Sequence, residues 1–364
     1  MSSGIGNRVK CTIFGESHGK AIGCVVDGLP AGENIDMDEM LVQMARRAPG
    51  RDKTATPRSE GDYPEILSGM LDGRTTGAPL AMMIVNHNTR SGDYEDIART
   101  PRPGHADYTG HVRYDGFNDI RGGGHFSGRL TAPLVFAGAV CRQILRRRGV
   151  HIGGHILEIH GARDEGFDPV KVDAQLLERL AAKPFSLIDQ AAEGLMREQV
   201  KTAQKNMDSV GGIVEAAAVG LPAGLGSPMF EGVENRLAAL LFGIPAVKGV
   251  EFGAGFGFAS MNGSTANDPF DYDKDGNVIT LSNNNGGILG GITSGMPLIV
   301  RAVIKPTSSI PQPQKTIDLI DGKSAELSVR GRHDPCIVPR ALPVVEAGLA
   351  LGLLDLIESE KKGG

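Results

Sequence analysis

The sequence predicts one large domain of the α/β (α+β) class, spanning residues 1–364. Three observations favour this class. Strand-like and helix-like segments alternate along the chain, no internal repeat is present, and no linker separates one part from another. Apolar residues make up 40% of the chain, which is enough for a sizeable core. The length alone would also allow two or three domains.

The first hundred residues read as strands around one helix. Residues 8–14 predict a strand, and the apolar run KAIGCVVDGLPAG predicts a second strand and a turn. A helix follows, with Asp36 as its N-cap and two arginines in its last turn before a Pro-Gly pair. The polar residues 50–62 predict a mobile loop, and residues 66–86 predict strands with tight turns.

The rest of the chain alternates between the two element types. Residues 131–148 predict a buried helix with Pro133 near its start and Gly149 after its end. Residues 260–285 predict a second mobile loop. The other expected elements are a strand at 152–160, a helix at 189–209, a strand and turn at 211–226, a helix and strand at 234–253, a strand at 298–304 and a helix at 343–358.

Charge and cysteine content exclude several classes of protein. The net charge of −5 argues against a general nucleic-acid binder, and no apolar stretch approaches membrane-spanning length. Four scattered cysteines without a C-x-x-C pair are typical of a cytoplasmic protein with reduced thiols. Residues 1–148 carry 19 Lys and Arg, mostly arginine, against 17 Asp and Glu, which favours a small polyanionic ligand.

The segment GESHG, residues 15–19, matches G-x-S-x-G, the nucleophile elbow of many serine hydrolases. That elbow needs a built parallel sheet before it and a helix after it. Only one strand precedes this segment, and the following residues read as a strand. The segment therefore predicts a loop between two strands, and a hydrolase using Ser17 stays an alternative.

Other familiar motifs fail on their details. The chain has no Walker A segment and no H-E-x-x-H, and its glycine runs miss G-x-G-x-x-G, so the sequence indicates neither a P-loop, a zinc protease nor a Rossmann site. DYDKDG at 271–276 resembles the start of an EF-hand, but Ser282 stands at position twelve where glutamate is needed. This segment predicts a polar hairpin turn. The histidines lack the spacing of a zinc site, so no metal is expected.

Five segments remain as candidates for chemistry. They offer two histidines able to exchange protons near neutral pH, an aspartate between cationic neighbours, and many groups suited to anions. RGGGHFSGR is a glycine-rich turn just before a helix, a favourable place for phosphate. Each segment alone would be an ordinary loop. Together they indicate proton handling on a phosphorylated substrate. The five segments are GESHG (15–19), RTPRPGHADYTGH (99–111), RGGGHFSGR (121–129), KPTSS (305–309) and RGRHDPC (330–336).

These segments, with GLPAGLG, AVKGVEFG and NNNGGILGGITSG between them, occur in an order that resembles chorismate synthase along nearly the whole chain. The resemblance implies a sandwich of antiparallel sheets around helices, assembled as a homotetramer. It implies an anti 1,4-elimination of phosphate from 5-enolpyruvylshikimate 3-phosphate, which yields chorismate at the last step of the shikimate pathway to aromatic amino acids. It also implies a need for reduced FMN, with NADPH as a candidate reductant, although the reaction causes no net redox change.

The resemblance also implies roles for individual residues. His18 resembles the acid that protonates the departing phosphate, and His105 the group beside the flavin N1. Asp334 resembles the base near the flavin N5, with Ser17 and Ser127 as relay hydroxyls. The implied substrate-binding cations are Arg47, Lys53, Arg102 and Arg129. The implied flavin-binding residues are His125, Phe126, Ser127, Ala246, Gly286, Lys305, Pro306, Thr307, Ser308, Ser309 and Arg332.

Two departures from the family pattern affect these roles. Many members read RSSAR where this chain reads HFSGR, so His125 and Phe126 replace an arginine and a serine near the cofactor. Lys53 stands where many members have arginine, which keeps the charge but loses the bidentate fork. A non-catalytic flavin-binding relative is therefore a further alternative, which the retained histidines and aspartate disfavour.

Overall fold

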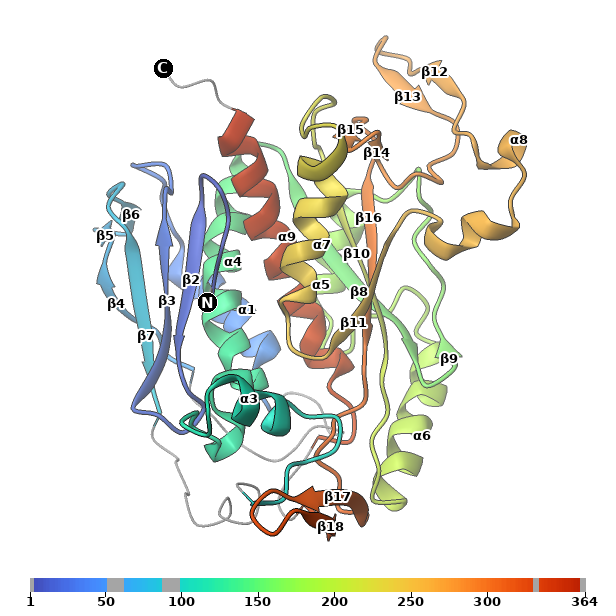
Figure 1. Cartoon of the computed structure of the whole chain (residues 1–364). Coiled ribbons are helices and arrows are strands. Elements are labelled where there is room, and N and C mark those ends of the chain that lie inside the picture. The colour runs from blue at the N-terminus through green and yellow to red at the C-terminus, as the bar shows by residue number, and fades with distance from the viewer. Residues whose placement is uncertain (1–2, 51–61, 87–98, 330–333, 361–364) are drawn as a thin grey trace.

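The computed structural model describes residues 3–50, 62–86, 99–329 and 334–360. Two five-stranded antiparallel sheets enclose a layer of helices, with two further helices outside the second sheet (Figure 1). This architecture agrees with the predicted α+β class and with antiparallel sheets around helices. Among the described residues, no helix is long and apolar enough to cross a membrane.

The first sheet covers one side of the helix layer, in the order β1-β2-β3-β7-β4. Alternate residues of β3 face the helices, where Ile22, Cys24 and Val26 are at most 1% exposed. This alternation is the expected pattern for a strand buried on one face. The strands are β1 (Gly4–Ile5), β2 (Lys10–Gly15), β3 (Ala21–Asp27), β4 (Glu65–Ser68) and β7 (Leu80–Val85).

The second sheet has the order β11-β16-β10-β8-β9, and its strands β8 and β10 are buried on both faces. Ala216 of β10 packs in the main core, whereas its neighbour Ala217 packs with Leu177 on the outer face. This double burial explains why the β10 sequence is apolar at successive positions. The strands are β8 (His151–Ile159), β9 (Ala162–Arg163), β10 (Gly212–Val219), β11 (Val247–Phe252) and β16 (Leu298–Ile304).

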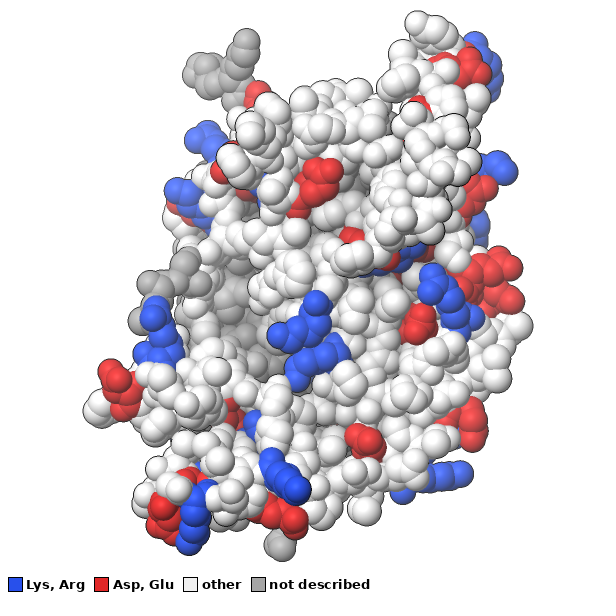
Figure 2. All heavy atoms as spheres, turned by 45° about the vertical axis from the view of Figure 1, so that its right-hand side comes forward, with Lys and Arg blue, Asp and Glu red and all other residues white. Residues whose placement is uncertain are grey.

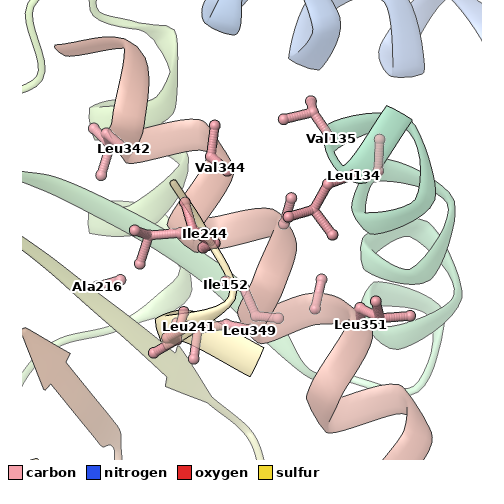
Figure 3. Close-up of a cluster of buried hydrophobic side chains, with 14 of the residues drawn as sticks. Leu134, Val135, Ile152, Ala216, Leu241, Ile244, Leu342, Val344, Leu349 and Leu351 are labelled. Atoms are coloured by element: carbon pink, nitrogen blue, oxygen red, sulfur yellow. The ribbon is translucent and has the colours of Figure 1, made fainter. Parts of the chain in front are cut away.

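Two long helices, α4 (Thr131–Arg147) and α9 (Val338–Glu360), form the centre of the layer. A Cβ on Gly138 would lie only 2.4 Å from Ala347 Cα, so the two backbones approach at this glycine. Figure 3 shows side chains of both helices, including Leu134 and Leu349, in one apolar cluster with Ile152 of β8. The layer is completed by α1 (Met37–Arg47) and α7 (Val233–Phe242).

Most predicted elements occur where expected, and two findings differ. Asp36 caps α1, because its carboxylate accepts from the backbone N–H groups of Asp38 and Glu39. The last helix begins at Val338, five residues before the predicted start at Pro343, because burial of its apolar residues outweighs the one hydrogen bond that this proline cannot make. Helix α5 (Ala174–Ala182) was not predicted; it covers the outer face of β8.

An arm projects from the second sheet beyond β11 (Figure 1). It carries the short helices η4 (Gly255–Ser260) and α8 (Gly263–Ala266), followed by the hairpin of β12 (Phe270–Tyr272) and β13 (Val278–Thr280). The turn of this hairpin lies in the DYDKDG segment, as predicted, with Asp271 and Tyr272 at the end of β12. The remaining elements are β5 (Met70–Leu71), β6 (Arg74–Thr75), α3 (Asp107–Arg113), η1 (Arg121–Phe126), η2 (Gly128–Leu130), α6 (Ala192–Lys205), η3 (Met229–Glu231), β14 (Ile288–Leu289), β15 (Ile292–Thr293), β17 (Gln314–Asp318) and β18 (Lys323–Leu327).

Of the two segments predicted to be mobile loops, residues 51–61 lie outside the described part of the chain. The segment 260–285 contains α8 and the β12–β13 hairpin, so it holds regular structure. Its mobility stays a prediction.

Candidate active site

The GESHG segment is a loop between β2 and β3, as predicted, and not a strand-to-helix elbow. Gly15 has φ +99°, and a Cβ there would lie 2.3 Å from the backbone oxygen of Ala21 across the hairpin. The backbone N–H of Ser17 donates to the carbonyl of Gly124 at 3.0 Å. The loop that carries Ser17 and His18 is therefore fastened to the RGGG turn.

The RGGG turn brings the two predicted histidines together. Gly122 and Gly123 have φ +61° and +84°, a backbone that side chains rarely adopt. A Cβ on Gly122 would lie 2.1 Å from His18 Nδ1, and one on Gly123 would lie 3.1 Å from His105 Cε1. Both imidazoles thus lie against consecutive glycines of one turn.

His105 is oriented by a buried acid at the start of α3. Asp107 Oδ1 accepts from His105 Nδ1 at 2.5 Å, and Asp107 also receives two hydrogen bonds from the Arg102 guanidinium at 2.7 and 2.8 Å. Burial raises the pKa of Asp107, but the hydrogen bonds and charges of Arg102 and His105 lower that pKa below its usual range. The bond to the carboxylate holds the proton on Nδ1, so Nε2 of a neutral His105 ring is left as an acceptor.

The KPTSS segment follows β16 and lies beside the His105 loop. Lys305 Nζ donates to the carbonyl of Gly104 at 2.6 Å, and Arg102 Nη1 donates to Ser309 Oγ at 3.0 Å. Burial, with the nearby charge of Lys248, lowers the pKa of Lys305. The segment therefore places an ammonium group and hydroxyls beside His105.

The other KPTSS residues lie within the same region. Thr307 Oγ1 donates to the backbone carbonyl of Asp334 at 3.1 Å, which joins this segment to the RGRHDPC segment. Ser308 lies beside Gly104, and Pro306 lies against Gly211 at the end of the second sheet. Ala246 is also close, because its carbonyl accepts from the Lys305 N–H at 2.9 Å.

Two predicted substrate-binding arginines share one buried carboxylate. Arg47, at the end of α1, donates from Nη1 to Asp62 Oδ2 at 2.6 Å, and Arg129 pairs with the other oxygen of Asp62. Asp62 is only 7% exposed. Such a clamp fixes the positions of two guanidinium groups while neutralising one of their two charges.

Asp334 pairs with Arg340 in the first turn of α9. Arg340 Nε also donates to the backbone carbonyl of Arg47 at 3.0 Å. This single arginine therefore connects the predicted base to the predicted substrate cations.

Ser17 and Ser127 share one hydrogen-bond acceptor, the backbone carbonyl of Gly124. Their backbone N–H groups both donate to the carbonyl of Gly124, at 3.0 and 3.4 Å. The Ser127 hydroxyl also accepts from the N–H of Arg129 at 3.3 Å. Both predicted relay residues thus lie on the His18 side of the site.

Three of the predicted cofactor-binding residues are not brought into this cluster. His125 bonds through both ring nitrogens within the protein: its Nδ1 donates to the Gly15 carbonyl at 2.7 Å, and its Nε2 lies 2.8 Å from the Ser3 hydroxyl. The ring of Phe126 packs against Tyr114, with 6.3 Å between ring centroids. Both side chains therefore have structural contacts that account for them.

Gly286 lies at the opposite end of β16 from Lys305. Its carbonyl accepts from the N–H of Ile299 near the start of that strand, about 16 Å from Ile304 at strand spacing. A flavin contact at Gly286 therefore stays a prediction, because within one chain Gly286 lies far from the other predicted flavin-binding residues. Lys53 and Arg332 lie outside the described residues.

Sequence reasoning missed three residues that build the site, namely Asp62, Asn86 and Arg340. Each contacts a predicted functional residue through its side chain. Asp62 lies in the segment 50–62, which the sequence predicts to be a polar loop, and Arg340 lies just before the predicted start of the last helix. Their segments carry no motif of their own, so only the fold reveals them.

The assembled site contains two imidazoles, three aspartates and a set of cations and hydroxyls. Within the described ranges, no group of His, Cys, Asp and Glu residues is suited to hold a metal ion. The fold and site define an enzyme that moves protons on a small, polyanionic substrate.

Comparisons with known proteins give the family. The chorismate synthase family model matches residues 9–357. A chorismate synthase of Thermococcus kodakarensis is 48% identical over 350 residues, 96% of each chain. One of Dehalococcoides mccartyi is 45% identical over 356 residues, 98% of this chain and 96% of the relative. A chorismate synthase crystal structure matches with a TM-score of 0.76 at 27% identity, covering 98% and 94% of the two chains. The chain belongs to the chorismate synthase family.

This membership confirms the resemblance, the fold class and the main function inferred from the sequence. The activity is that of a carbon–oxygen lyase of the shikimate pathway, which depends on reduced FMN and releases phosphate from 5-enolpyruvylshikimate 3-phosphate to give chorismate. The serine hydrolase and the non-catalytic flavin-binding relative receive no support.

Proposed function

We propose that His18 is the acid of this elimination and that His105 faces the flavin across the same glycine turn. In the net reaction, a ring C–H bond and the bond from the ring to the phosphate oxygen break, and the phosphate leaves with the electron pair of that bond. The observation that carries the proposal is the position of both imidazoles against Gly122 and Gly123. A proton from His18 would quench the charge that develops on the leaving phosphate.

The residues around His105 fit a reduced flavin. The Lys305 ammonium, the KPTSS hydroxyls and the Arg102 guanidinium form a donor set for anionic groups, and Ala246 has φ +74°, which presents its backbone beside this set. When bound, reduced FMN supplies transient electron density to the substrate ring and helps in the removal of its proton. When its ring carries protons on both nitrogens, His105 would keep its bond to Asp107 and donate from Nε2 to the flavin edge where negative charge resides.

The remaining proposed roles concern the substrate. Arg47 and Arg129, held by Asp62, would bind substrate anions, with Arg102 at the boundary between substrate and cofactor. Asp334, held by Arg340, would accept a proton on the cofactor side, and the hydroxyls of Ser17 and Ser127 would relay protons near His18. Lys53 and Arg332 stay in the proposed site on the family pattern alone.

The assignment of His18 is tested by comparing His18→Ala with Ser17→Ala under anaerobic conditions with dithionite-reduced FMN. Chorismate absorbance and released phosphate are followed together. We expect His18→Ala to lose most of the turnover and Ser17→Ala to lose less. Loss of all activity in Ser17→Ala, together with labelling by a serine-directed acylating reagent, would contradict the proposal.

The source of reducing equivalents is a separate proposal. We infer that reduced flavin is supplied from outside, because the chorismate synthase family model accounts for residues 9–357 and leaves no separate reductase domain within that span. The same assay with NADPH and oxidised FMN tests this inference. Chorismate formation in that mixture, without any other reductase, would show that the protein uses NADPH itself.

We also propose that the protein is a cytoplasmic homotetramer. The arm exposes large apolar side chains, with Phe256 89%, Phe270 66% and Tyr272 70% exposed. Figure 2 shows that much of the arm's surface, at upper right, is uncharged apart from its tip and edge. Exposed apolar surface of this kind favours contact with a second copy of the chain. Light scattering of the wild type and of Phe256→Asp tests the assembly, and equal masses at the monomer value in both would contradict it.

A further inference from the structure

Asn86 lies directly after β7 and joins two parts of the site, the loop that carries His18 and the side chain of Arg129. Its side-chain amide Nδ2 donates to the carbonyls of Glu16 at 3.2 Å and Gly19 at 3.0 Å. Its Oδ1 accepts from Arg129 Nε at 3.3 Å. The two carbonyls lie on either side of Ser17 and His18, so one amide group closes the loop that presents the proposed acid.

The chemistry of these partners fixes how the amide is oriented. A backbone carbonyl can only accept a hydrogen bond, and an arginine Nε–H can only donate one. The NH₂ of Asn86 must therefore face the His18 loop, and its oxygen must face Arg129. A carboxylate at this position would lose both donors, and an apolar side chain would lose all three hydrogen bonds.

The same chain of contacts continues beyond Arg129. Arg129 pairs with Asp62, and Asp62 pairs with Arg47. Asn86 is therefore the link between a clamp of two anion-binding guanidinium groups and the loop that carries His18. The backbone N–H of Asn86 also donates to the carbonyl of Lys20 at 3.0 Å, directly after the loop.

We propose that Asn86 is a positioning residue that holds His18 in register with Arg129. The inference rests on the proposed role of His18 as the acid. A proton donor and an anion-binding group must be placed together to act on one leaving phosphate, and a displacement of about 1 Å can cost about 100-fold in rate. Asn86 itself need not touch the substrate.

The test measures the effect of Asn86→Asp in two backgrounds, the wild type and the His18→Ala variant. Asn86→Asp keeps the acceptor for Arg129 and removes both donors to the loop. We expect kcat to fall about 10-fold to 100-fold with a smaller change in KM, because the anion-binding clamp is retained. In the His18→Ala background we expect Asn86→Asp to cause less than about a 2-fold further loss, since it acts through His18.

Hydrogen exchange of the backbone provides a readout that does not depend on turnover. The N–H groups of Ser17 and Gly19 are bonded within the loop region, to Gly124 and Glu16. We expect Asn86→Asp to speed exchange of these two amides, measured in the protein without ligands. This measurement separates the inference from the proposed function. The faster amide exchange is expected even where His18 proves not to be the acid, because exchange reports only on how firmly the loop is held.

Gln143→Glu is a matched control. The Gln143 side chain also bonds a backbone carbonyl and a backbone N–H, both of Asp36, and it lies on α4 away from the site. We expect this variant to lose thermal stability while its kcat and the exchange of the Ser17 and Gly19 amides stay at the wild-type values.

Three outcomes would overturn the positioning role. One is a wild-type kcat in Asn86→Asp. Another is the same fold loss of kcat with and without His18, which would indicate a general structural role. The third is unchanged exchange of the Ser17 and Gly19 amides.

Discussion

His18 and His105 come from different loops, yet their rings lie against adjacent glycines of one turn. A Cβ on Gly122 would approach His18 Nδ1 to 2.1 Å, and a Cβ on Gly123 would approach His105 Nε2 to 3.2 Å. The turn therefore sets the separation of the two imidazoles. The turn can pass this close to both rings because its backbone has three successive positive φ values, at Gly122, Gly123 and Gly124. Such a backbone explains why the sequence has glycine at each of these positions.

Gly122→Ala is expected to displace His18 and to lower kcat by roughly 100-fold or more. The added methyl group cannot coexist with the ring, and the left-handed backbone adds a cost of about 1 kcal/mol or more. Steady-state kinetics with reduced FMN, together with a thermal melt, measure both effects.

Gly128→Ala is the matched control for this substitution. It lies in the same segment, but a Cβ there meets no heavy atom within 4 Å. We expect wild-type turnover and stability for this variant. A folded Gly122→Ala protein with turnover within a factor of about two of the wild type would show that the turn does not position His18.

The sequence predicted the parts of the fold that local patterns decide. The cap at Asp36, the loop between β2 and β3 and the hairpin turn at 271–276 follow from short-range chemistry, and all three occur. The start of α9 was misplaced, because Pro343 is a local signal and the burial that overrides it comes from distant parts of the chain.

The candidate site was predictable only where motifs exist. His18, His105 and Asp334 stand in segments with unusual composition, and the resemblance supplied their roles. Asp62 stands in a polar loop and Asn86 at the end of an apolar strand, and their importance depends on contacts with Arg129, which is distant from both in the sequence. Such contacts leave no mark in a single sequence, so only the folded chain shows them.

Asp107→Asn is expected to lower the free energy of unfolding at pH 7 by about 3 kcal/mol, since it leaves the buried Arg102 without its paired charge. The pKa of Asp107 is lower in the folded protein than in the unfolded chain. Its contribution is therefore present above its ordinary pKa and is lost as the pH falls through the lowered value. Urea unfolding should show a smaller difference from the wild type at pH 3 than at pH 7.

The control for Asp107 is Asp321→Asn, which breaks an exposed pair with Arg99. We expect less than about 1 kcal/mol for this surface pair. A difference of equal size at pH 3 and pH 7 for Asp107→Asn would show that the carboxylate does not titrate as described.

Lys305→Met is expected to raise the Kd for FMN by about 10-fold to 100-fold, the effect of removing one hydrogen bond from a charged group. Burial holds the pKa of Lys305 below its ordinary value, and an anionic ligand would favour the charged form. Titration calorimetry at two salt concentrations measures the loss. Lys248→Met, at an exposed position nearby, should change the Kd little, and equal effects of the two substitutions would argue against a specific role for Lys305.

His155 is fully buried between two acidic side chains, and it has no proposed catalytic role. Its Nδ1 and Nε2 lie 3.0 Å from oxygens of Asp164 and Glu215, respectively. A neutral ring has one N–H, so only the doubly protonated ring can donate to both carboxylates. Burial lowers the pKa of His155, but the hydrogen bonds and charges of the two acids raise it above its ordinary value.

The stabilisation from this imidazolium is fully present below its ordinary pKa of about 6.5 and is lost as the pH rises through the raised folded value. His155→Gln should therefore cost about 3 kcal/mol at pH 6, and the difference from the wild type should shrink at higher pH. Urea unfolding between pH 6 and pH 9 measures this change, and nitrogen NMR reports whether both ring nitrogens carry protons at pH 7. His151→Gln, at a half-buried site beside Glu178, serves as the control and should show little effect. A neutral His155 ring at pH 6, or a difference that does not vary with pH, would mean that the two acids are held by other contacts.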